Sequence, residues 1–330
     1  MRAAKYIILL SSIILIESCG CTSHQRQNNL SGNLSLDDTP ILDPEGKPLA
    51  IHDTIFLKYL PEKKSMVPQL PETLSFAGER VPLEYFDVRE SLYRELIVMS
   101  YRHSANTYML QLSTRWFPVI KPILKEEGIP EDFIYLCVAE SDLQNQISPA
   151  GAVGFWQFMK GTAKEYNLEI SETVDERSNV EKATRAACSF LRKSYEKYGT
   201  WAVAAASYNM GTNNTTKRIE TQQQDNYYNL AMPNETSRYL FRILAFKLLF
   251  QDMEKYGFHL DEQDFFKPLQ WRDVTITKDI NSLAEFAKKY DTNVKVLKMF
   301  NPWLISTSLK VKRGKSYIIH IPKEGFRTEK

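Results

Sequence analysis

The chain has 330 residues, of which 43% are hydrophobic and 25% are charged, and its formal net charge is +2. This length and composition are ordinary for a globular protein with one large core and a smaller second domain. The nearly balanced charge argues against electrostatic capture of nucleic acid, and no internal repeat of solenoid period is visible.

Residues 1–18 have the features of a targeting segment. A basic start precedes a short apolar run at 6–16, which is too short for a transmembrane helix. The segment leads into Glu17-Ser18-Cys19-Gly20, which resembles a bacterial lipoprotein cleavage box and implies that Cys19 is lipidated. We therefore expect a lipid anchor in the cell envelope, at the outer membrane and facing the periplasm. An ordinary secretory signal with another cleavage point is the alternative.

A linker and a lead follow. Residues 19–50 are rich in Ser, Asn, Asp, Gln, Pro and Gly and predict a flexible linker with a reach of roughly 100 Å. The lead covers 51–119. Its first part, to about residue 83, is irregular and proline-rich, and helical spacing of apolar residues begins at Leu83 and continues to Glu127.

The stretch 131–141 contains a carboxylic acid on an apolar helix face. Phe133, Leu136, Cys137 and Glu140 recur at helical spacing, and only the last is polar. Burial and the C-terminal end of the helix dipole both disfavour the negative charge, so the pKa of Glu140 is expected to rise, as a general acid requires. The alternative is a glutamate that emerges into water or meets an arginine.

A glycine-containing segment comes next. Gly151 and Gly154 permit positive φ and a close approach of the backbone to a ligand. Trp156, Gln157 and Met159 then offer a flat apolar surface, an amide and a thioether, a mixture that suits the faces and hydroxyl groups of sugar rings.

Three further helices are predicted at 180–198, 201–208 and 235–250. The alanine-rich second one suggests tight packing, and Gly211 is a plausible stop signal after it. The polar stretch 212–233 is predicted to be a loop, either beside a cleft or simply solvated.

The last segment, at 271–323, predicts a separate small module. Val274 and Ile276 alternate as in a strand, Ser282 and Asn293 are candidate caps of two short helices, and 317–321 forms a closing strand.

Cysteine and histidine usage points to no metal site. The 5 histidines lack ligand spacing. Cys137 and Cys188 are either two buried thiols or a disulfide formed in an oxidising compartment. No cofactor is expected.

Four motifs in order resemble the catalytic domain shared by soluble-type lytic transglycosylases and goose-type lysozyme (glycoside hydrolase family 23), closest to the family's membrane-bound D subclass. The resemblance covers roughly 120–250. It is carried by the helix ending in Glu140-Ser141 and by three later segments: the run from Ser148 to Met159, Ser207-Tyr208-Asn209-Met210-Gly211, and Glu235-Thr236-Ser237-Arg238-Tyr239. The C-terminal module similarly resembles a LysM domain, although it lacks the glycine-aspartate turn after the first strand.

The resemblance implies that Glu140 is the single catalytic acid/base. It also implies a set of residues that bind or orient the substrate: Ser148, Gln157, Met159, Tyr208, Asn209, Glu235 and Tyr239. The implied partner is the glycan strand of peptidoglycan, and the implied fold is mainly α. That fold comprises a lysozyme-like all-helical catalytic domain at 120–260, preceded by the helical lead, and a small strand–helix–helix–strand LysM-like module at 268–324.

A single carboxylate favours a lyase over a hydrolase, because most glycosidases use two. The expected reaction cleaves the bond between N-acetylmuramic acid and N-acetylglucosamine and leaves a 1,6-anhydro end. A lysozyme-type hydrolase and a catalytically silent wall-binding lipoprotein are the alternatives. A monomer is expected. Whether the module binds sugar or only packs stays open.

Overall fold

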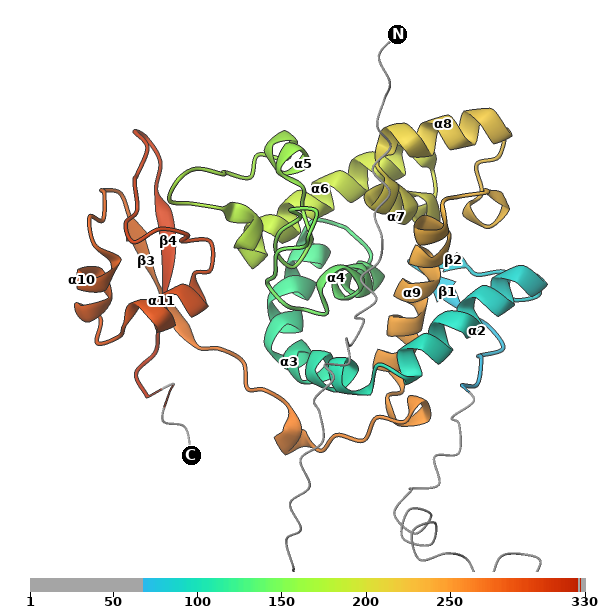
Figure 1. Cartoon of the computed structure of the whole chain (residues 1–330), viewed down its shortest axis with the longest axis horizontal. Coiled ribbons are helices and arrows are strands. Elements are labelled where there is room, and N and C mark those ends of the chain that lie inside the picture. Colours follow the sequence, from blue (N-terminus) through green and yellow to red (C-terminus); the bar gives the residue numbers. More distant parts are fainter. Residues whose placement is uncertain (1–67, 326, 328–330) are drawn as a thin grey trace, which may run out of the picture. The chain divides into compact units, whose positions relative to one another are not determined.

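The computed structural model describes residues 68–325 and residue 327. The expected signal segment, Cys19, the linker and the lead up to residue 67 lie outside the described residues. The helices and strands, in chain order (Figure 1), are β1 (Ser75–Phe76), β2 (Glu79–Arg80), α2 (Phe86–Ser100), α3 (His103–Glu126), α4 (Ile134–Ser141), α5 (Lys160–Glu165), α6 (Val180–Tyr198), α7 (Trp201–Met210), α8 (Thr212–Gln222), α9 (Asn234–Gln251), β3 (Trp271–Ile276), α10 (Leu283–Lys288), α11 (Val294–Phe300) and β4 (Tyr317–Pro322).

Helix α4 lies inside the helical part of the chain. A 3₁₀ turn at Glu131–Phe133 leads into it, and apolar residues cover most of its sides, so the helix is buried against α3 and α9. It ends where Asp142 adopts a left-handed conformation with φ of 49°. The helix predicted at 131–141 is therefore present, with its first turn tightened.

Helix α7 packs on both α6 and α9, and α9 packs on α4. Asn179 and Thr200 cap the N-termini of α6 and α7, and Gly199 ends α6 in the left-handed region. The buried alanines at 202–206 allow α6 and α9 to approach α7 closely. Helix α2 runs along α9, so the lead is part of the same core.

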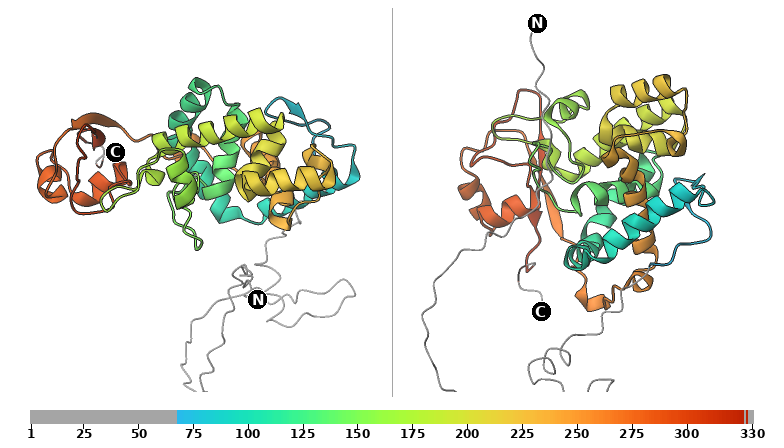
Figure 2. Two further views of the ribbon diagram at one scale, coloured as in Figure 1. Left: turned by 90° about the horizontal axis from the view of Figure 1, so that it is seen from above. Right: turned by 45° about the vertical axis from the view of Figure 1, so that its right-hand side comes forward.

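The prediction of a loop over 212–233 is wrong in its first half, because 212–222 forms α8 (Figures 1 and 2). Thr215 is the only buried residue of this polar helix. A helix without an apolar stripe gives no periodic signal in the sequence. Helix α8 is held by packing on α7 and by paired hydrogen bonds between Gln222 and Ala231.

The C-terminal module has the predicted strand–helix–helix–strand order. Strands β3 and β4 pair antiparallel from Trp271 opposite Pro322 to Ile276 opposite Tyr317, and α11 packs on β4 and on α10. The side chains of Ser282 and Asn293 cap α10 and α11, as predicted. The prediction of a mainly helical chain with a small α+β module is confirmed.

Cys137 and Cys188 are two buried free thiols, which settles the alternative that the sequence left open. Among the described residues, no helix is long and apolar enough to cross a membrane.

Candidate active site

Glu140 lies in the last turn of α4 and is partly buried. The hydroxyl of Tyr239, from the first turns of α9, donates a hydrogen bond to its Oε1. Burial raises the pKa of Glu140 to about 7, although the Tyr239 hydrogen bond and the charge of Arg242 lower it, and the Glu235 carboxylate adds to the rise. A carboxyl group with this pKa can both donate and accept a proton near neutral pH.

Tyr208, in α7, lies near the same carboxyl. Its hydroxyl donates to the carbonyl oxygen of Trp156 at 2.8 Å, and its ring packs edge-on against Phe158 and Phe190. Burial, together with the charge of Glu140, raises the pKa of Tyr208 well above its ordinary value. This tyrosine is therefore a neutral, fixed hydrogen-bonding group.

Asn209 and Glu235 connect the end of α7 to the start of α9. The Asn209 amide donates to Glu235 Oε1 at 3.3 Å, and its oxygen accepts a hydrogen bond from the Thr236 hydroxyl at 2.7 Å. Asn209 therefore has a fixed orientation. Its hydrogen bonds fix the start of α9, which includes Tyr239, relative to the end of α7.

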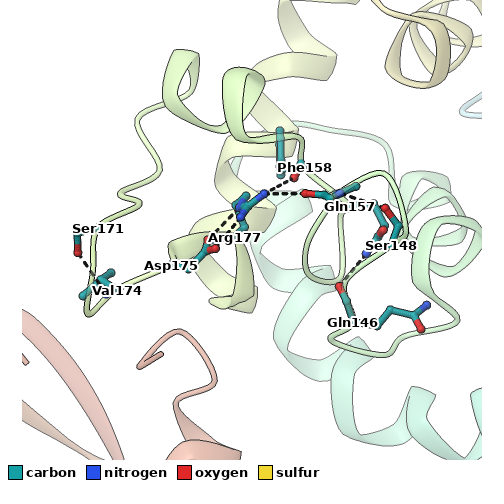
Figure 3. A network of polar contacts seen from close by, with 10 residues as sticks. Gln146, Ser148, Gln157, Phe158, Ser171, Val174, Asp175 and Arg177 are labelled. Carbon is teal, nitrogen blue, oxygen red and sulfur yellow. Dashed lines mark hydrogen bonds and ion pairs between the residues drawn. The ribbon is translucent and has the colours of Figure 1, made fainter. Parts of the chain in front are cut away.

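The segment from Ser148 to Met159 forms a tight loop braced from within. Gln157 has a positive φ of 47°, and its amide donates to the carbonyl oxygens of Gln146 at 3.1 Å and Gly154 at 2.8 Å. Ser148 Oγ accepts a hydrogen bond from the Ala152 amide at 3.0 Å. Two of the predicted binding residues of this loop, Ser148 and Gln157, are thus held in place (Figure 3).

Arg177 braces this loop from the segment that follows it (Figure 3). It is paired with Asp175 at 2.7 Å, and it donates to the carbonyl oxygens of Gly151 at 3.1 Å and Phe158 at 3.2 Å. Gly154 lies so close that a Cβ there would be 2.0 Å from the Arg177 carbonyl oxygen. The bracing role of Asp175 and Arg177 comes from the structure, because it depends on contacts between separate segments.

The same segment joins the C-terminal module. The Asp175 amide donates to the Trp303 carbonyl at 2.9 Å, and the Ile305 amide donates to the Thr173 carbonyl at 3.2 Å. Glu169 pairs with Lys312 at 2.8 Å and Lys315 at 2.7 Å. One chain segment, 169–177, therefore both braces the glycine-containing loop and contacts the C-terminal module.

The interpretation of Trp156 as a sugar-stacking surface is wrong. Its side chain is fully buried, and its Nε1 donates to the Thr184 hydroxyl at 2.9 Å. Tertiary packing against α6 removes it from solvent. Met159, which is 47% exposed, is the apolar side chain that this loop presents to solvent.

A cavity of about 300 Å³ opens beside Glu140. It is lined by residues of α2, α4 and α9 and by the turns that follow α2 and α4: Glu95, Val98, Met99, Arg102, Ala139, Glu140, Ser141, Asp142, Gln146, Arg238, Arg242, Ala245 and Phe246. Asp142 also lines this cavity, where Arg102 binds its carboxylate at 2.6 Å. Its pairing with an arginine distinguishes it from Glu140. The arginines were missed because nothing in their spacing indicates a common site.

Comparisons with known proteins agree with this geometry. Residues 118–231 match the transglycosylase SLT domain, and residues 272–325 match the soluble lytic transglycosylase C-terminal LysM-like domain. The chain is 24% identical to the membrane-bound lytic murein transglycosylase D of Escherichia coli K12, over 96% of this chain and 68% of that protein. The same values hold for the protein of that name from Escherichia coli O6:H1.

The first matched region contains Glu140 and Tyr208, and the second contains the β3–β4 pair. The chain therefore carries a transglycosylase SLT domain followed by the LysM-like C-terminal domain of soluble lytic transglycosylases, and it is homologous to membrane-bound lytic murein transglycosylase D.

Proposed function

We propose that this protein is a peptidoglycan lytic transglycosylase that cleaves the bond between N-acetylmuramic acid and N-acetylglucosamine and leaves a 1,6-anhydro end. The observation that carries the proposal is Glu140, whose pKa is raised by burial to about 7 and whose carboxyl oxygen accepts a hydrogen bond from Tyr239. The match to the transglycosylase SLT domain supports the same reaction class.

Glu140 acts first as a general acid. It gives its proton to the glycosidic oxygen, and the departing N-acetylglucosamine leaves positive charge at C1 of the muramoyl sugar, which the sugar's own N-acetyl group stabilises. The Glu140 carboxylate then accepts the proton of the C6 hydroxyl, whose oxygen closes on C1. Glu140 is thereby protonated again, as it was before the reaction, and no water is consumed.

The other two carboxylates that line the cavity are bound to arginines, and Glu235, which does not line it, accepts a hydrogen bond from Asn209. Asp142 is paired with Arg102 and Glu95 with Arg238, each at 2.6 Å. A hydrolase of the usual kind needs a second free carboxylate, which attacks C1 or activates water. The pairing therefore favours the intramolecular route over a lysozyme-type hydrolysis.

The remaining predicted residues receive roles that match their contacts. Tyr239 orients the Glu140 carboxyl, and Asn209 with Glu235 fixes the start of α9. Tyr208 is a fixed hydrogen-bonding group near the reacting sugar. Three residues of the braced loop hold the sugars beside the scissile bond: Ser148, Gln157 and Met159.

The test is mass spectrometry of the products released from purified sacculi by wild type and by Glu140→Gln. Anhydro-terminated products from wild type alone support the proposal. Reducing ends only would identify a lysozyme, and release by both proteins would place the chemistry on another residue. Absence of release by wild type would favour a wall-binding protein without turnover.

The proposal includes a lipid anchor at Cys19 and a place at the outer membrane, facing the periplasm. The cleavage-box pattern supports it, as does the relative whose name calls it membrane-bound. Wild type is expected in the detergent-soluble membrane fraction, and Cys19→Ser in the soluble fraction after release. Equal membrane association of both would mean that the anchor lies elsewhere.

The proposed division of labour assigns cleavage to 120–260 and wall attachment to the LysM-like module at 268–324. The match of residues 272–325 to the LysM-like domain supports sugar binding by this module. Its contacts with Glu169 and Thr173 support a packing role as well. Retention of the Glu140→Gln protein on insoluble sacculi, with and without competing N-acetylglucosamine oligomers, tests the binding role.

A further inference from the structure

The cavity beside Glu140 is unusually rich in arginine. Three guanidinium groups line it: Arg102 from the turn after α2, and Arg238 and Arg242 from α9. All three positions lie outside residues 118–231, which match the transglycosylase SLT domain. Arg102 lies in the segment before the matched region, whereas Arg238 and Arg242 lie on α9 just beyond its last matched residue.

Two of the arginines are already engaged. Arg102 donates to Asp142 at 2.6 Å, and Arg238 donates to the two carboxylate oxygens of Glu95 at 2.6 and 3.3 Å. Glu95 is 3% exposed, so its negative charge is held inside the wall rather than presented to the cavity.

Arg242 is not engaged in the same way. Its Nε lies 4.0 Å from Glu95 Oε2, and no hydrogen bond joins its guanidinium to another described residue. The side chain is 34% exposed. A guanidinium group has five donors in a planar arrangement that fits the two oxygens of a carboxylate. The cavity thus holds three cations, two paired anions and Glu140, whose raised pKa keeps it largely uncharged below neutral pH.

We propose that this cavity binds a carboxylate of the glycan strand being cleaved, with Arg242 as its principal ligand. The proposal rests on the proposed function and adds a recognition element to it. One bound carboxylate would neutralise Arg242, the arginine that has no close carboxylate partner. The cavity of about 300 Å³ is larger than a carboxylate alone, so part of the attached group fits as well. Because the cavity opens at Glu140, the carboxylate must belong to a substituent near the scissile bond.

Two sources offer this chemistry. One is a carboxylate of the wall peptide attached to the muramoyl sugar. The other is the lactyl carboxylate of a muramoyl sugar from which the peptide has been removed. Both place an anion on a flexible arm close to the reacting sugar, so strands prepared in different ways must separate them.

The experiment compares wild type, Arg242→Gln and Arg242→Lys on three soluble strands. The first carries peptides, the second has been stripped by an amidase and has free lactyl carboxylates, and the third has been stripped and its carboxylates converted to neutral amides. Arg89→Gln is the matched control, because Arg89 is an exposed arginine of α2 that does not line this cavity. Thermal unfolding of each variant verifies folding.

We expect Arg242→Gln to raise KM about tenfold more on the strand that supplies the carboxylate than on the amidated strand. The charge of Arg242 also lowers the pKa of Glu140, and any effect of the substitution through that pKa is common to all three strands. Arg242→Lys should restore part of the loss. An effect confined to the peptide-bearing strand identifies the peptide carboxylate, and an effect on the stripped strand identifies the lactyl carboxylate. Equal effects on all three strands, or none on any, would overturn the proposal.

The failure of this site is distinguishable from failure of the proposed function. Equilibrium binding of the same three strands is measured in the Glu140→Gln background, which requires no turnover. Weaker binding of the carboxylate-bearing strand on adding Arg242→Gln supports the site even if no anhydro product forms. Unchanged binding overturns it even if the enzyme is an active transglycosylase.

Discussion

Replacing the carboxyl of Glu140 by an amide is expected to stabilise the folded protein in a pH-dependent way. The substitution Glu140→Gln removes a group that is buried beside Tyr239 and whose ionised form is disfavoured by that burial. Near pH 8 the wild-type chain must fold with this carboxylate charged, whereas glutamine stays neutral. The variant should therefore be the more stable protein at high pH.

The sign follows from proton linkage. The pKa of Glu140 is raised from the ordinary 4.5 to about 7, so between these values the folded chain holds a proton that the unfolded chain has released. The stability contributed by this proton is fully present below about pH 4.5 and is lost as pH rises through 7. A pKa difference of one corresponds to about 1.4 kcal/mol, so the loss amounts to about 3 kcal/mol.

Urea unfolding followed by circular dichroism, at about pH 4, 6 and 8, measures this difference. The free energy of unfolding of Glu140→Gln minus that of wild type should rise by about 3 kcal/mol across the range. Glu196→Gln is the control, because Glu196 is an exposed residue of α6 and its substitution should give a flat difference. A flat difference for Glu140→Gln as well would refute the claim that the fold holds this carboxyl neutral.

Three further changes test the surroundings of the site. Tyr239→Phe removes the hydroxyl that donates a hydrogen bond to Glu140, so the pKa of that carboxyl should rise further. If Glu140 is the general acid, the alkaline limb of kcat/KM should move up by about one pH unit, and an unmoved limb would contradict this. Gly154→Ala would place a Cβ 2.0 Å from the Arg177 carbonyl oxygen at a φ of +88°, and should lower the free energy of unfolding by at least about 1 kcal/mol. Gly161→Ala, with no atom within 4 Å of the added Cβ, should not lower it, and equal melting temperatures for the two would count against the close packing. Burial raises the pKa of Glu169, but hydrogen bonds from two lysines and a tyrosine of the C-terminal module outweigh it and hold this pKa at about 2. Glu169→Gln should therefore speed amide hydrogen exchange where the module joins the helical domain. In wild type this contact should persist at neutral pH and weaken as pH falls from about 4.5 toward 2. Unchanged exchange in the variant would mean that the pairs do not hold the module.

Local pattern was sufficient to predict most helices and their ends. The apolar face of 131–141 leads to Glu140, Gly211 ends α7, and Ser282 caps α10, because periodicity and capping are decided within a few residues. The polar helix α8 was missed for the same reason, since it has no apolar stripe to read.

The environment of each side chain depended on packing between distant segments. Trp156 belongs to a loop that suits sugar binding, yet its side chain is fully buried and donates a hydrogen bond to Thr184 of α6. The motif at 235–239 predicted Tyr239, and the structure places its hydroxyl on the carboxyl of Glu140, 99 residues earlier in the chain.

The sequence by itself determined the fold class and the order of most elements, because periodicity and capping are encoded in residue type and spacing along one segment. Its motifs also led to the proposal that Glu140 is the reactive carboxyl. Only the tertiary structure decided which charges surround that carboxyl. Glu95 and Arg238 are 143 residues apart and meet because α2 packs along α9. The raised pKa of Glu140 and the arginine-lined cavity beside it arise from such contacts, since desolvation and Coulomb interactions depend on distance in space and not on separation along the chain.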